Sequence, residues 1–184
     1  MSIPVPSAND NASAARLLAK VPQITALFWL TKIFATTFGE TAGDALSMSL
    51  NLGYLFSTFI FAGIFILAVY LQIKSKVFHP FLYWFAIIAS TTVGTTLADY
   101  VDRSLGIGYV GGSTILLSLV CLSLWVWHKV EGTITPHVVH QPRTELFYWL
   151  TITFSQTLGT ALGDWSADTA GLGYTGGILL FSGL

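Results

Sequence analysis

Charged side chains are scarce in this sequence. Asp, Glu, Lys and Arg together make up 9% of its 184 residues, whereas a soluble domain has about 25%. The formal net charge is −1, so the chain lacks the basic excess that binds nucleic acid, and we expect no such partner. Because 53% of the residues are hydrophobic and the mean hydropathy is +0.69, the sequence predicts an integral membrane protein in contact with a lipid bilayer.

Cysteine and the common enzyme motifs are also missing. Cys121 stands alone, which excludes an internal disulfide and a cysteine metal cluster. The sequence has no HExxH, GxSxG or Walker motif, so we expect neither an enzyme nor a resident cofactor. The histidines show no clear ligand spacing, and we interpret the loop HKVEGTITPHVVHQPRTE as a solvated connector rather than a metal site. The four histidines are His79, His128, His137 and His140.

Long apolar runs are the main feature of the sequence. A membrane span needs about 20 apolar residues, and five runs qualify: 24–45, 54–73, 80–100, 109–128 and 145–165. A sixth run begins near Tyr174 and stops at Leu184, which is about half a bilayer in length. We therefore predict an all-α polytopic membrane protein with about six transmembrane helices, and we interpret the last helix as incomplete and the chain as part of a longer one.

The basic residues predict the orientation of these spans. Six of them fall in the N-terminal tail and in the loops after the second and fourth runs, whereas Arg103 lies on the opposite side. The six are Arg16, Lys20, Lys74, Lys76, Lys129 and Arg143. Cytoplasmic loops are enriched in Lys and Arg, so we expect a cytoplasmic N-terminus. The polar residues 1–19 are interpreted as a disordered cytoplasmic tail.

One sequence motif occurs three times in the chain. The stretch TTFGETAGDALSMSLNLGY returns as TTVGTTLADYVDRSLGIGY, and a third copy follows; they align on Asp44, Asp99 and Asp164. The shared pattern is W-x7-T-x-G-x4-D-x8-G-Y. Its other fixed positions are Trp29, Trp84 and Trp149; Thr37, Thr92 and Thr157; Gly39, Gly94 and Gly159; and Tyr54, Tyr109 and Tyr174. Such constant spacing indicates a tandem repeat.

The repeat predicts how the chain is organised. Residues 20–77, 78–135 and 136–184 each hold one copy, the last with one and a half helices. We expect each copy to be a helical hairpin, with the two spans joined by a short outer loop. Two spans per copy give every copy the same orientation, so the copies are parallel repeats around an axis along the membrane normal. The three Asp residues should then lie at one depth.

The pattern resembles a bacterial inner-membrane family defined by a tandem repeat of unknown function. The resemblance covers the chain from about Lys20 to its end and implies a location in the bacterial inner membrane. Members usually have four copies, whereas three are seen here. The family implies no activity, so the function must be argued from the residues.

The polar positions of the repeat favour a path for cations. A Thr seven residues before an Asp lies within about 20° of it on a helix, so we expect Thr37, Thr92 and Thr157 to share a water-accessible vestibule with the three Asp residues. Glu40 lies one turn deeper than Asp44, and Lys32 lies deeper again. Ionisable residues inside a membrane suggest ion paths or proton relays.

The predicted function is therefore a cation transporter. A ring of carboxylate and hydroxyl oxygens suits Mg²⁺, Ca²⁺ or Mn²⁺, so Asp44, Asp99 and Asp164 are the candidate ligands of a transported or bound divalent cation; proton coupling needs only the carboxylates. The alternative is a scaffold or partner subunit that transports nothing, in which the Asp residues cap the outer loops and the Trp and Tyr residues anchor the interfaces. A homo-oligomer is compatible with both.

Overall fold

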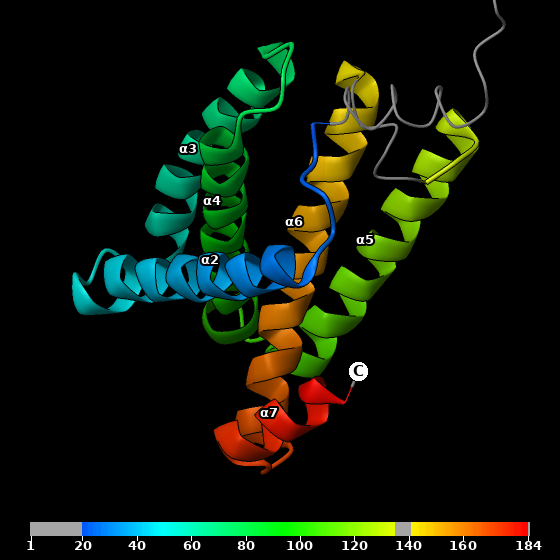
Figure 1. Cartoon of the computed structure of the whole chain (residues 1–184). Helices are drawn as coiled ribbons and strands as arrows, with labels where there is room; N and C mark the ends of the chain where they lie inside the picture. The colour runs from blue at the N-terminus through cyan, green and yellow to red at the C-terminus, as the bar shows by residue number, and fades with distance from the viewer. Residues whose placement is uncertain (1–19, 135–140, 184) are drawn as a thin grey trace, which may run out of the picture.

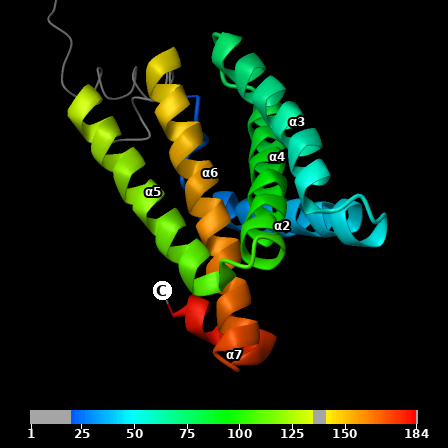
Figure 2. The ribbon, with the colours of Figure 1, turned by 180° about the vertical axis from the view of Figure 1, so that it is seen from behind.

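The computed structural model describes residues 20–134 and 141–183, and its regular structure is entirely helical (Figures 1 and 2). This confirms the all-α prediction for the described part. The predicted tail 1–19 and the histidines His137 and His140 lie outside the described residues. The α-helices are α2 (Ala26–Asp44), α3 (Tyr54–Lys74), α4 (Pro80–Asp99), α5 (Gly108–Glu131), α6 (Pro142–Asp164) and α7 (Gly173–Ser182).

The three repeats share one local structure after the aspartate. Each Asp ends an α-helix that continues into a five-residue π-helical turn: η1 (Ala45–Ser49), η2 (Tyr100–Ser104) and η4 (Trp165–Thr169). The glycine before each repeat Tyr then has a positive φ, at 77° for Gly53, 75° for Gly108 and 61° for Gly173. Glycine adopts this conformation at no steric cost, which explains the fixed Gly-Tyr pair.

A second left-handed position precedes each of these glycines. Gly106 and Gly171 have a φ of 69°, and the equivalent residue of the first repeat, Asn51, has a φ of 56°. Asparagine is among the few residues that visit this region routinely. The turn after each Asp therefore has left-handed residues at the same two positions in all three repeats, even where the sequence differs.

Helix α4 lies at the centre of the molecule. It packs against α2, α3 and α6, while α5 packs against α6, and α2 lies across the other long helices (Figures 1 and 2). The repeats were predicted to be hairpins, but the most extensive pairs, α3 with α4 and α5 with α6, join consecutive repeats. The connection 75–79 between α3 and α4 is five residues long, and short helix connections favour antiparallel neighbours.

Among the residues that the structure describes, three helices are long and apolar enough to cross a membrane: Tyr54–Lys74, Pro80–Ser104 and Gly108–Glu131. The prediction of five spans is therefore supported for three of them. Helices α2 and α6 are more polar; α2 carries Lys32, Glu40 and Asp44 along one side. The outer surface is apolar, with Phe81 92% exposed and Phe59 68% exposed, as the lipid-facing side of a membrane protein would be.

The repeat glycines let two helix pairs approach closely. A Cβ added at Gly39 would lie 2.9 Å from both Ile88 O and Thr91 Cβ on α4. A Cβ added at Gly94 would lie 2.7 Å from Thr157 Oγ1 and 3.2 Å from Thr157 N on α6. Small residues at such contacts are typical of helix packing in membranes. Gly159 differs, because an added Cβ would meet nothing within 4 Å.

This difference gives a matched test of the packing. Gly94→Ala should destabilise the protein by about 1–3 kcal/mol, because the new methyl group is forced against the backbone of α6. Gly159→Ala, at the same position of the next repeat, should leave stability unchanged or raise it by up to about 1 kcal/mol through helix propensity. Thermal unfolding of both variants in detergent checks this. Equal melting temperatures for the two variants would contradict the close contact.

Candidate functional site

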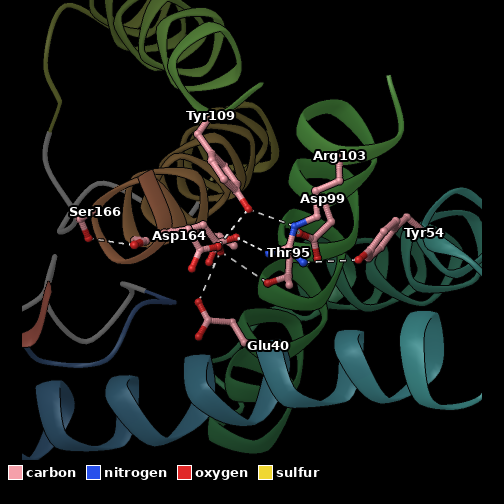
Figure 3. Close-up of polar contacts among 11 residues, drawn as sticks. Glu40, Tyr54, Thr95, Asp99, Arg103, Tyr109, Asp164 and Ser166 are labelled. Carbon is pink, nitrogen blue, oxygen red and sulfur yellow. Dashed lines mark hydrogen bonds and ion pairs between the residues drawn. The ribbon is translucent and has the colours of Figure 1, made fainter. Parts of the chain in front are cut away.

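Four carboxylates from all three repeats line one cavity of about 520 Å³. Glu40 and Asp44 come from α2, Asp99 ends α4, and Asp164 ends α6. The apolar side of the cavity is formed mainly by α7 and by Met48 of η1. Figure 3 shows the side chains of Glu40, Asp99 and Asp164 converging from three different helices.

The repeat register explains why these residues meet. Helices α4 and α6 contact each other through residues 65 positions apart, which is the spacing of the second and third repeats. The pairs are Thr95 Oγ1 with Thr160 Oγ1 at 3.4 Å, Thr91 Oγ1 with Gln156 Oε1 at 3.0 Å, and Tyr83 OH with Tyr148 OH at 2.6 Å. Equivalent residues of the second and third repeats therefore lie side by side, whereas α2 of the first repeat lies across the other long helices and does not share this register (Figure 1).

Arg103 of η2 lies among the carboxylates. Its Nε is 3.0 Å from Asp99 Oδ1, and its Nη2 is 3.4 Å from Asp164 Oδ2. The guanidinium also donates to Tyr109 OH at 3.1 Å and to Tyr54 OH at 3.5 Å (Figure 3). Two of the repeat tyrosines thus accept hydrogen bonds from a cationic side chain that lines the cavity. Sequence reasoning used Arg103 only for orientation, although its i, i+4 spacing from Asp99 was a visible signal.

Polar side chains continue from the cavity toward the middle of the bundle. Thr160 Oγ1 donates to Glu40 Oε1 at 3.3 Å. One turn deeper, Gln156 Oε1 accepts from Lys32 Nζ at 2.5 Å, and Gln156 Nε2 donates to Ser90 Oγ. The predicted row of charged residues from Lys32 to Asp44 is therefore present along α2. Lys32, however, lies below the cavity and donates a hydrogen bond to the side-chain amide of Gln156.

The predicted threonines do not line the cavity. Thr92 and Thr157 are each 1% exposed, and their hydroxyls donate to the carbonyl oxygens of Ile88 and Thr153 on their own helices, while Thr37 is exposed. Their place is taken by residues four before the Asp, namely Glu40, Thr95 and Thr160. Both spacings lie near the Asp on a helical wheel, and the helix contacts decide which one faces the cavity.

The other repeat markers have unequal surroundings. Trp29 is 57% exposed and Tyr174 is 79% exposed, in keeping with interface anchors. Trp149, in contrast, is 2% exposed and packs in the core against Tyr83. A single anchoring role, as the sequence suggested, therefore does not describe all three tryptophans.

The three aspartates do not act as loop caps within the described structure. Each precedes a π-helical turn, and none of them makes a side-chain hydrogen bond that caps it. Asp99 is 3% exposed and turns its carboxylate toward Arg103. The capping role proposed as the alternative is thus not what these side chains do here.

The carboxylates of the cavity are not arranged as a compact metal site. Within residues 20–134 and 141–183, no three His, Cys, Asp or Glu side chains lie together as ligands of one metal ion would. The carboxylates instead surround a space much larger than a dehydrated ion. Direct ligation of a divalent cation by Asp44, Asp99 and Asp164 together would need them to move closer to one another.

A family model covers most of the chain. The model Repeat of Unknown Function (DUF347) matches three times, at residues 27–78, 82–133 and 147–184. The chain belongs to the DUF347 family. The three matches coincide with the three Asp-containing copies, which confirms the tandem repeat. Comparisons of this DUF347 chain with curated proteins and with solved structures found no match.

Proposed function

We propose that this DUF347 protein is a cation transporter of the bacterial inner membrane, with its N-terminus on the cytoplasmic side. The observation that carries the proposal is that Glu40, Asp44, Asp99 and Asp164 line one cavity. A charged side chain in mid-bilayer costs about 2.5–3.5 kcal/mol. Because this chain has few charged residues, four carboxylates in one cavity suggest a functional role. One guanidinium among four carboxylates leaves the cavity negative and attractive to a cation.

The polar residues below the cavity support a path rather than an isolated pocket. Glu40, Gln156 and Lys32 follow one another between α2, α4 and α6. Such a line can carry protons or coordinate a moving cation. Coupling to protons, or transport of a hydrated divalent cation, fits this arrangement better than a site that strips an ion of its water, because the carboxylates are spread around the cavity.

Flux through the purified protein tests the proposal. The full chain is reconstituted into liposomes, and uptake is measured for Mg²⁺, for Mn²⁺, for protons and for a labelled organic ammonium ion. We expect uptake of at least one of these, and a loss of at least tenfold in the variant Asp44→Asn/Asp99→Asn/Asp164→Asn, whose asparagines keep the shape of the aspartates. Equal uptake by the variant and the wild type, or no uptake of any cation, would refute transport.

The second candidate is a membrane scaffold or partner subunit. The observation in its favour is Arg103, which pairs with two of the four acids as a purely structural network would. A scaffold predicts that the triple variant loses stability but that neither protein carries any cation. Unfolding and flux measured on the same preparations therefore separate the two functions.

A further inference from the structure

We propose that the cavity binds an organic cation, with an ammonium or guanidinium head held by the carboxylates of α2 and an apolar body held by α7. This inference rests on the proposed function and names its substrate class. It goes beyond a general preference for cations, because three features indicate what kind of cation fits. They are the size of the cavity, its apolar lining and the surroundings of Arg103.

The first argument is size. The cavity has a volume of about 520 Å³, within the range of about 300–1,000 Å³ found for pockets that hold organic ligands. An inorganic ion without its water shell fills only a small part of such a space. A ligand that fills it needs a body as well as a charge.

The second argument is the distribution of lining groups. The acids lie on α2, α4 and α6, whereas the apolar part of the lining consists of Tyr174, Ile178 and Phe181 on one face of α7, together with Met48. These apolar side chains are 42–79% exposed. A cavity with one acidic and one apolar wall matches a ligand that is cationic at one end and apolar at the other.

The third argument is the position of Arg103, a cationic side chain that lies among the carboxylates of the cavity. The Arg103 guanidinium meets the carboxylates of Asp99 and Asp164 and two tyrosine hydroxyls, and its Cζ is 6.0 Å from the centre of the Tyr109 ring. Carboxylates combined with an aromatic face are a common means of holding organic cations. The lining around Asp99 and Asp164 therefore already holds a group of this class.

Arg103 also decides which carboxylates remain for a ligand. It pairs with Asp99 and Asp164, and no ion pair within the described residues reaches Glu40 or Asp44. These two acids are four residues apart on α2 and thus share one helix face. Glu40 receives one hydrogen bond, from Thr160, so its carboxylate can accept more from an ammonium head.

Binding to the full chain in detergent tests the proposal with three simple probes. Benzylammonium carries both a charge and an apolar ring, benzyl alcohol keeps the ring without the charge, and ammonium chloride keeps the charge without the ring. We expect calorimetry to show benzylammonium binding at least tenfold more tightly than either partial probe. Glu40→Gln should weaken this binding at least tenfold and Phe181→Ala about fivefold, whereas Glu131→Gln, far along α5, should not change it.

Three results would overturn the inference. Ammonium or Mg²⁺ binding as tightly as benzylammonium would show a site for bare cations, and equal binding of benzyl alcohol would show an apolar groove without charge recognition. No binding of benzylammonium, or binding indifferent to Glu40→Gln, would remove the site altogether. The proposed function fails separately: benzylammonium binding without any flux refutes transport alone, and inorganic flux without benzylammonium binding refutes only the substrate class.

Discussion

Lys20→Met should destabilise the protein by about 3–5 kcal/mol, the range found when one partner of a buried ion pair is removed. Lys20 Nζ lies 2.5 Å from Glu145 Oε1, and the two side chains are 6% and 1% exposed. The same ammonium donates to the carbonyl oxygens of Gln72 and Ile73 at 3.3 and 3.1 Å. One side chain thus ties the segment before α2 to the last turn of α3 and the first turn of α6.

The matched control is the double variant Lys20→Met/Glu145→Gln. It removes both members of the pair, so the double-mutant cycle measures their coupling, and we expect it to recover at least half of the lost stability. Chemical unfolding of the three proteins in the same detergent provides the comparison. A single variant within about 1 kcal/mol of the wild type would show that this contact contributes little to holding the segment before α2 against α3 and α6.

Asp99→Asn should reduce the flux of whichever cation the wild type carries by at least tenfold. Asp99 is 3% exposed, lines the cavity and pairs with Arg103. Asparagine keeps its size but removes the charge, so Arg103 loses its nearest carboxylate and the cavity becomes less negative. Both effects weaken the attraction for a cation.

Asp102→Asn is the control for this experiment. Asp102 is three residues further along, 6% exposed and also acidic, but it lies against Gly112 at the start of α5 and does not line the cavity. Its replacement should leave the flux per folded molecule nearly unchanged. An equal loss of flux in both variants would mean that general damage to η2, rather than the cavity carboxylate, explains the effect.

Much of the site followed from spacing alone. The constant distances within the repeat identified Asp44, Asp99 and Asp164 as equivalent positions, with Glu40 one turn from Asp44, and all four line the cavity. Their prediction at one depth assumed parallel helices, whereas α2 lies across the other long helices (Figure 1). The glycine before each repeat tyrosine was found in the same way, and its positive φ supplies the reason for it. These features depend on local geometry, which the sequence encodes directly.

Other features depended on which helices pack together. A helical wheel puts residues four and seven before each Asp on nearly the same face, and only the contacts of α4 with α2 and α6 directed Thr95 into the cavity and buried Thr92 between helices. The same packing buried Trp149, which its spacing alone would have placed at an interface.

By itself, the sequence determined the all-α class, the threefold repeat and the equivalent positions of its three aspartates, since these follow from hydropathy and period. The tertiary structure decided that Arg103 pairs with acids from two repeats, that α7 supplies an apolar wall and that α2 lies across α4. Such contacts bring together segments that are distant in the sequence, as Arg103 and Asp164 are, 61 positions apart. No local pattern specifies which faces of similar helices will meet, because several faces offer the small and apolar side chains that packing requires.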